Sequence, residues 1–170
     1  MGRDVTLYTA QWGDLSLEET CRKAQEMGYD GLELACNDNH LDLSRLSEPY
    51  IAEVLATLEQ YRLKLYAISN HCVGQCVCDP IDIRHKSIIP SHIWGDGDPE
   101  GVRQRAAREM IKTGRAAAIL GVGTVIGFTG SPIWHMLYSF PAVSPEQIEA
   151  GYAEFARRWR PILDEYQKLG

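Results

Sequence analysis

The sequence lacks an apolar run of the about 20 residues needed to cross a bilayer, and residues 1–5 lack the apolar core of a secretory signal peptide. It also lacks an excess of positive charge, because 23 Asp and Glu residues outnumber 17 Lys and Arg residues and give a net charge of −6. Nucleic acids and anionic membranes attract basic surfaces. We therefore expect a cytoplasmic protein that binds neither.

The five cysteines are an odd number, which argues against a framework of disulfides and favours free thiols. Three of them, Cys72, Cys76 and Cys78, follow His71 closely. Their C-x₃-C-x-C spacing differs from the paired C-x₂-C arrangement of structural zinc sites. Zinc binding here is the weaker alternative.

A length of 170 residues predicts one domain over residues 1–170. Along it, short runs of β-forming residues alternate with longer helical patterns. The predicted strands are residues 5–11, 31–36, 64–69 and 124–128. Helices are expected to begin at Ser16, near Ser47, at Asp98-Pro99 and at Ser144-Pro145. Pro161 predicts a kink or break in the last of them.

This alternation implies a parallel sheet, either as part of a (β/α)₈ barrel or as a small doubly wound sheet. The segments after the third and fourth predicted strands, residues 70–97 and 129–143, are long, whereas helix-to-strand connections such as Gly121-Val122-Gly123 are short. Barrels carry their functional residues in the loops that follow the strands. The loop lengths therefore favour the barrel.

Several short motifs bear on the family. Residues 29–34, Tyr-Asp-Gly-Leu-Glu-Leu, are similar to the second-strand signature of the xylose isomerase-like TIM barrel superfamily. Residues 67–71, 73–75, 78–82, 94–101 and 127–135 resemble its sugar phosphate isomerase/epimerase branch. The resemblance implies four consecutive βα units of a (β/α)₈ TIM barrel, an N-terminal half barrel. Residues 37–40, Asn-Asp-Asn-His, depart from the Trp-Gly pair expected there, so an aromatic pocket wall is missing.

The resemblance also implies metal-assisted proton transfer on a sugar or related hydroxyketone. A divalent metal ion (Mn²⁺, Mg²⁺, Co²⁺ or Zn²⁺) stabilises the enediolate formed beside the carbonyl, and paired carboxylates move the proton. In the family the Glu, Asp and His ligands come from strands five to eight. The chain ends at Gly170 after the fourth unit, so we expect no catalytic or metal residue here and an inactive chain in isolation.

Candidate substrate-binding residues lie at or after the predicted strands, where barrels hold their ligands. His71 follows the third strand directly, and Gln75 lies four residues beyond it. Glu33 is a charged residue in an apolar strand, so it either faces the barrel mouth or pairs with an arginine. The others are Trp12, His40, Trp134 and His135; for each, ordinary packing is the competing interpretation.

A half barrel leaves two strand edges and one sheet face uncovered, and uncovered edges promote association. We therefore expect a partner, which is either a second copy of the chain or a separate half-barrel; the alternative is that the sequence is a fragment of a longer barrel. Two functions stay open at this point. One is a sugar isomerase or epimerase that acts on a sugar-like substrate; the other is a non-catalytic half-barrel used for assembly or small-molecule binding.

Overall fold

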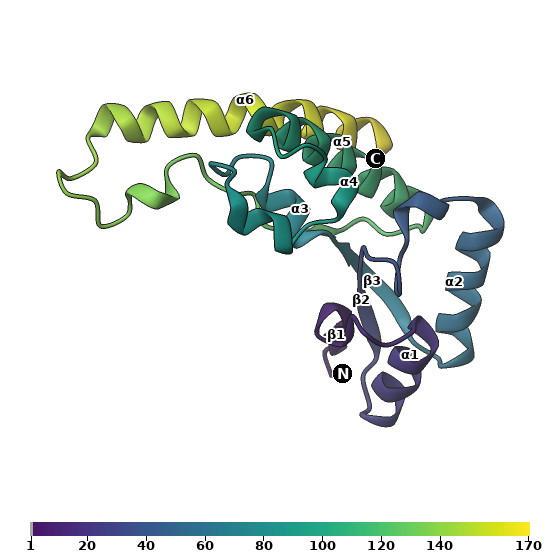
Figure 1. Ribbon diagram of the computed structural model, residues 1–170. Helices are drawn as coiled ribbons and strands as arrows, with labels where there is room; N and C mark the ends of the chain where they lie inside the picture. Colours follow the sequence, from purple (N-terminus) through teal and green to yellow (C-terminus); the bar gives the residue numbers. More distant parts are fainter. Residues whose placement is uncertain (1) are drawn as a thin grey trace. The chain divides into compact units, whose positions relative to one another are not determined.

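The computed structural model describes residues 2–170, which form two compact units (Figure 1). The first unit holds the residues up to Ser69 together with residues 112–126 and Gly170. The second holds residues 70–111 and 127–169. Helix α5 (Pro99–Ile119) belongs to both, because the chain passes from the second unit back into the first within this helix.

The first unit is built on a four-stranded parallel sheet with the strand order β1-β2-β3-β4. The strands are β1 (Thr6–Tyr8), β2 (Gly31–Ala35), β3 (Lys64–Ser69) and β4 (Val125–Ile126). Each strand pairs with the next one in sequence, and the order shows none of the reversal that defines a doubly wound sheet. The prediction of four consecutive βα units of a (β/α)₈ barrel is confirmed, and β1 and β4 are the edges of the described sheet.

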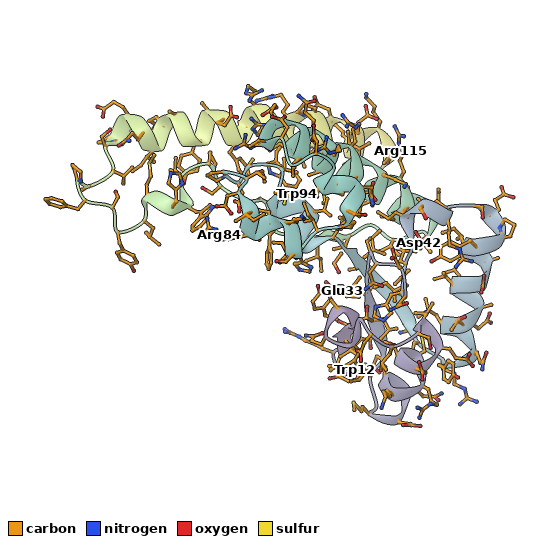
Figure 2. The ribbon with its side chains drawn as sticks, in the orientation of Figure 1. Trp12, Glu33, Asp42, Arg84, Trp94 and Arg115 are labelled. Carbon is orange, nitrogen blue, oxygen red and sulfur yellow. The ribbon has the colours of Figure 1, made fainter. Side chains whose placement is uncertain are left out.

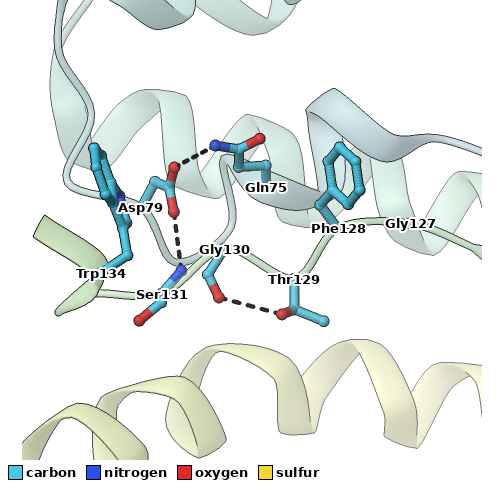
Figure 3. A pocket seen from close by; sticks show the side chains of 8 residues that line it. All are labelled: Gln75, Asp79, Gly127, Phe128, Thr129, Gly130, Ser131 and Trp134. Carbon is cyan, nitrogen blue, oxygen red and sulfur yellow. Dashed lines mark hydrogen bonds between the residues drawn. The ribbon is translucent and has the colours of Figure 1, made fainter. Parts of the chain in front are cut away.

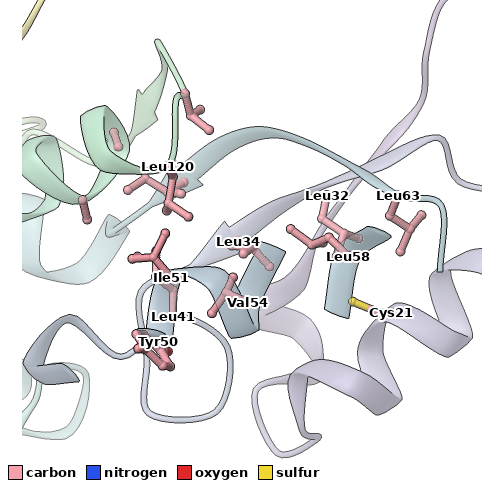
Figure 4. Packing of buried hydrophobic residues seen from close by; sticks show 14 of the residues in the cluster. Cys21, Leu32, Leu34, Leu41, Tyr50, Ile51, Val54, Leu58, Leu63 and Leu120 are labelled. Atoms are coloured by element: carbon pink, nitrogen blue, oxygen red, sulfur yellow. The ribbon is translucent and has the colours of Figure 1, made fainter. Parts of the chain in front are cut away.

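Apolar side chains from the sheet and its helices form the core of this unit (Figure 4). Leu32 and Leu34 of β2 are completely buried. They pack in one cluster with residues of α1 (Leu17–Glu26), α2 (Glu48–Gln60) and the last turns of α5. Because side chains alternate along a strand, Glu33 between them belongs to the opposite face of the sheet.

Local capping explains where the first two helices begin. The Ser16 hydroxyl accepts from the Glu19 amide, and the Glu19 carboxylate accepts from the Ser16 amide, which completes the predicted capping box. Ser47 caps α2 in the same way through the amide of Tyr50. These caps satisfy amides that the first helical turn leaves without partners, so the predicted helix starts are confirmed.

The second unit is almost entirely helical. Residues 70–97, predicted as a long loop, contain α3 (His71–Gln75), a 3₁₀ turn at Ile83–Ser87 and α4 (Ser91–Trp94). The long helix α6 (Pro145–Leu169) is joined to α5 by an ion pair between Arg158 and Glu100 at 2.8 Å. Figure 2 shows the side chains of both units, including the labelled Trp12, Glu33 and Arg84.

Three predicted elements differ from the structure. The first strand ends at Tyr8, not Gln11, because the chain turns into a 3₁₀ helix in which the Thr9 hydroxyl accepts from the Ala35 amide. The fourth strand is also shorter than predicted. Helix α6 does not break at Pro161, since the flanking Trp159 and Ile162 are buried and hold both of its halves in place.

No helix within residues 2–170 combines the length and the apolar character that a membrane span requires.

The buried leucines of β2 are expected to carry much of the stability of the first unit. Leu34→Ala should lower the free energy of unfolding by about 2–5 kcal/mol, because it leaves a cavity in a packed cluster. Leu55→Ala is the matched control, since Leu55 on α2 is 39% exposed. Urea unfolding followed by circular dichroism measures both. Equal losses in the two variants would contradict this account of the core.

Candidate functional site

The segments that follow β3 and β4 in the chain line an open groove of about 410 Å³ in the second unit (Figure 3). Its lining consists of Gln75, Asp79, the run from Gly127 to Ser131, and Trp134. Loops after parallel strands are the usual ligand-binding segments of β/α barrels. The groove is therefore the first place to look for the site that the sequence predicts.

Two glycines allow the backbone after β4 to lie directly against α3. A Cβ atom on Gly74 would come within 2.3 Å of the Phe128 carbonyl oxygen. A Cβ atom on Gly130 would come within 2.1 Å of the Gln75 carbonyl oxygen, and the φ angle of Gly130 is +66°. Larger residues would push the two segments apart, so these glycines determine the width of the groove.

The carboxylate of Asp79 connects the walls of the groove. It is 1% exposed and has three hydrogen-bond partners, of which Figure 3 shows Gln75 and Ser131. One oxygen accepts from the Gln75 amide at 2.8 Å and lies 3.2 Å from Nε2 of His85; the other accepts from the Ser131 backbone amide at 2.9 Å. Burying a carboxylate costs free energy unless hydrogen-bond donors surround it. Gln75, His85 and Ser131 provide these contacts for Asp79.

His85 is the buried partner behind Asp79. Its Nδ1 lies 3.1 Å from the backbone amide of Asp82 and 3.2 Å from the carbonyl oxygen of the same residue. When Nδ1 accepts from that amide, the ring carries its proton on Nε2 and donates it to Asp79. The backbone around this pair is also held, because Arg103 donates to the Asp79 carbonyl oxygen at 2.9 Å.

Aromatic side chains also line the groove, with Trp134 next to Asp79 and Phe128 at the other end (Figure 3). The Trp134 ring is 40% exposed, and the guanidinium of Arg84 stacks on it at 5.1 Å from the ring centroid. Phe128 meets the ring of His71 edge-on at 4.8 Å. The indole of Trp159 in α6 donates to the Thr129 carbonyl oxygen at 2.9 Å. This bond anchors the loop after β4 to helix α6.

The seven candidate residues divide between the two units. Gln75 and Trp134 line the groove, His71 contacts it through Phe128, and His135 is exposed beside Trp134 with ring centroids 6.2 Å apart. Trp12, Glu33 and His40 belong to the first unit. The structure thus brings four of the candidates together, and the binding role of all seven stays a prediction.

Glu33 presents a chemical question of its own. Register places it level with Tyr8 and Ala67 on the sheet. Its Oε1 atom is buried and receives no hydrogen bond from any group within residues 2–170. The sequence left two interpretations of Glu33 open: it faces the barrel mouth, or it pairs with an arginine. Within residues 2–170, no arginine donates to this oxygen.

His40 occupies a different kind of environment. It is 1% exposed, its Nδ1 lies 3.3 Å from the Asn37 side-chain amide, and its Nε2 lies 3.3 Å from the Thr20 hydroxyl. Burial lowers the pKa of His40, although backbone carbonyls of Trp12 and Leu15 act in the opposite direction. In this position the ring connects the loops after β1 and β2 to helix α1.

The described residues do not fit the metal centre that the resemblance implies. No group of three or more His, Cys, Asp or Glu side chains within residues 2–170 is arranged to hold a metal ion. All five cysteines are free. Burial raises the pKa of Cys76 to about 12 and that of Cys78 to about 11, so both groups are thiols in the metal-free chain at neutral pH.

Sequence reasoning did not propose Asp79, His85 or Ser131 as site residues, although residues 78–82 and 127–135 belong to the motifs that resemble the family. Asp79 and His85 lie in a polar stretch with several other charged residues, and nothing in their six-residue spacing distinguishes them. Ser131 contributes only its backbone amide, which no sequence pattern reports.

The fold and the groove define a class of protein, the β/α barrels. Within that class, the family described as "Xylose isomerase-like TIM barrel" matches residues 21–170, and the chain belongs to this family. Comparison with curated proteins finds no match.

Three solved structures with a similar fold are epimerases by their titles. The 3-keto-D-glucoside 4-epimerase from E. coli is 16% identical with a TM-score of 0.58, and the match covers 98% of this chain and 52% of that one. A D-psicose 3-epimerase from Clostridium cellulolyticum H10, solved with D-tagatose, is 15% identical with a TM-score of 0.57, over 99% and 50% of the two chains. A D-psicose 3-epimerase solved in the presence of D-fructose is 17% identical with a TM-score of 0.56, and the match covers 99% of this chain and 50% of that one. The chain thus spans about half the length of these proteins.

The buried His40 gives the fold a defined pH dependence. Because burial lowers its pKa below the ordinary 6.5, the unfolded chain binds this proton more readily. The contribution of neutral His40 to stability is therefore present above about pH 6.5 and is lost as the pH falls through the folded-state pKa. His40→Gln should make the unfolding free energy less dependent on pH between 7.5 and 5 than in the wild type. Denaturant titrations at several pH values measure this; parallel pH profiles would contradict it.

Proposed function

We propose that the chain supplies sugar-binding loops of an isomerase or epimerase of the xylose isomerase-like family. The observation that carries the proposal is the composition of the groove: an exposed indole ring, and an amide with a buried carboxylate behind it. Ligand sites combine apolar and aromatic walls with a few fixed polar groups. A sugar offers both an apolar C–H face and hydroxyl groups to such an arrangement.

The proposed substrate is a sugar or a related hydroxyketone. The similar structures are epimerases of keto sugars by their titles, and two of them were solved with D-tagatose or D-fructose. In this chain, Trp134 would contact the C–H face while Gln75 binds a hydroxyl. His71, which contacts Phe128, and His135, which lies beside Trp134, would bind further hydroxyls. Glu33, Trp12 and His40 are kept as candidates on the first unit.

Proton transfer requires more than these loops provide. The described residues hold no cluster that fits a divalent metal ion, so no catalytic step is assigned to one here. We propose that the residues for that chemistry belong to a second half-barrel, which would pair with the edges of the sheet at β1 and β4. The buried Oε1 of Glu33 supports such a partner, because burying a carboxylate oxygen without a donor is unfavourable.

A non-catalytic half-barrel for assembly or small-molecule binding is the second candidate. It is favoured by the same lack of a metal-binding cluster within residues 2–170. The first candidate and the small-molecule-binding form of the second predict a ligand in the groove, but only the first predicts turnover once a partner half is added.

Binding at the groove can be tested with D-fructose as the probe. Trp134→Ala should weaken its binding about fivefold, since stacking of an apolar face on an aromatic ring contributes on the order of 1 kcal/mol. Leu137→Ala is the control, because Leu137 lies in the same loop, is 71% exposed and does not line the groove. Saturation-transfer NMR and calorimetry measure the affinities. Equal affinity of the two variants, or no binding by the wild type, would contradict the proposed function.

The uncovered edges of the sheet predict association. Edge strands expose unpaired backbone groups, and Oε1 of Glu33 needs a donor that the described residues do not supply. We expect a concentration-dependent dimer, or a complex with a separate half-barrel, in size-exclusion chromatography with light scattering. A folded monomer that persists at micromolar and higher concentrations and ignores an added half-barrel would contradict the prediction.

A further inference from the structure

A hydrogen bond to Asp79 fixes the orientation of the Gln75 side-chain amide. Its amide faces a carboxylate oxygen of Asp79 at 2.8 Å. A carboxylate has only acceptor atoms, so the end of the amide that faces Asp79 must be the NH₂ group. The carbonyl end is then directed away from Asp79, and it receives no hydrogen bond from residues 2–170 in a side chain that lines the groove.

We propose that Asp79 is a positioning residue that makes Gln75 a hydrogen-bond acceptor in the groove, so that the groove selects ligands with a hydroxyl donor at this point. The inference rests on the proposed sugar-binding function and specifies how one contact of that site discriminates. A ligand that presents a carbonyl, a fluorine or another pure acceptor there meets the Gln75 oxygen without a proton between them. Such a mismatch leaves polar groups unpaired and reduces binding.

His85 and Ser131 keep Asp79 in this role. Ser131 donates its amide to one carboxylate oxygen, and His85 shares the other oxygen with Gln75. Asp79 is 1% exposed and His85 is 3% exposed, so water does not compete for these bonds. Gln75 thus faces a carboxylate that cannot rotate away, and its amide cannot exchange its two ends without placing two acceptors together.

The substitution Asp79→Asn reverses this polarity with almost no change of shape. The Asn oxygen can still accept from Ser131, and its NH₂ group takes the place of the other carboxylate oxygen. Gln75 must then turn its carbonyl toward Asn, which directs its own NH₂ into the groove. His85 can follow, because Nδ1 also lies 3.2 Å from the Asp82 carbonyl oxygen. In that tautomer Nε2 accepts from the Asn.

The first arm of the test needs no ligand. ¹⁵N NMR of the 170-residue chain should show His85 protonated on Nε2 in the wild type and on Nδ1 in Asp79→Asn. Asp96→Asn is the matched control, because it removes the same charge from the same unit at a site that does not line the groove. It should leave the His85 tautomer unchanged. A wild-type His85 protonated on Nδ1 alone, or a tautomer that ignores Asp79→Asn, would overturn the proposed arrangement.

The second arm measures selectivity with D-fructose and its 1-, 3-, 4- and 6-deoxyfluoro derivatives, in which fluorine replaces a hydroxyl donor. We expect the wild type and Asp96→Asn to bind one derivative about tenfold more weakly than D-fructose, the size of one lost hydrogen bond. In Asp79→Asn that ratio should approach one or reverse. Gln75→Leu should also remove it, with weaker binding of D-fructose.

The outcomes separate the two proposals. If Asp79→Asn weakens D-fructose and every derivative by the same factor, Asp79 is only structural and the inference is wrong, while sugar binding stands. If selectivity survives in Gln75→Leu, another group binds that hydroxyl and the inference is again wrong. If the wild type binds none of these sugars, the proposed function fails and the selectivity claim with it, whatever the NMR arm shows about Asp79 and His85.

Discussion

The buried carboxylate of Asp79 is the interaction on which the second unit depends. Its acceptor atoms are shared by α3, by the 3₁₀ turn at Ile83–Ser87 and by the loop after β4. Each of these segments is too short to be stable alone, since helices of fewer than about 12 residues are marginal in water. One desolvated charge that requires donors from all of them makes their folding mutually dependent. The shape of the groove therefore depends on the hydrogen bonds of Asp79, which hold together the segments that line it.

The same network explains why the groove combines unlike surfaces. Glycines at positions 74 and 130 let two backbones approach within the space that a Cβ atom would occupy. This close approach brings the backbone amide of Ser131 to Asp79, and the same loop contributes Phe128 and Trp134 to the lining. The polar contacts of the groove thus come from the segment after β3, and its aromatic contacts come from the loop after β4.

Much of the first unit could be predicted from the sequence, because its determinants are local. Each determinant can be recognised from a few consecutive residues: the capping serines at 16 and 47, the β-forming run of β2, and the bounds of β3. β1 and β4 were predicted too long, since strand length depends on the pairing partner and not on β propensity alone. The site was predictable only in part: position after a strand identified Gln75 and Trp134. The Asp79 network was not, because one of its bonds joins residues 52 positions apart through a backbone amide.

The first unit presents the complementary constraint. A parallel sheet is normally covered on both faces, and here the described helices α1, α2 and α5 account for the core on one of them. Glu33 belongs to the other face, with an oxygen that is withdrawn from water and has no donor within residues 2–170. If this position served packing alone, a leucine would stabilise the sheet more than a glutamate, because burying a leucine carries no cost of desolvating a charge. Its presence on β2 is best explained by a donor that arrives from outside the described residues, either a substrate hydroxyl or a cationic side chain of a pairing half. A substrate hydroxyl would reach Glu33 from this face of the sheet, whereas a cationic side chain would have to come from a second half-barrel packed against it.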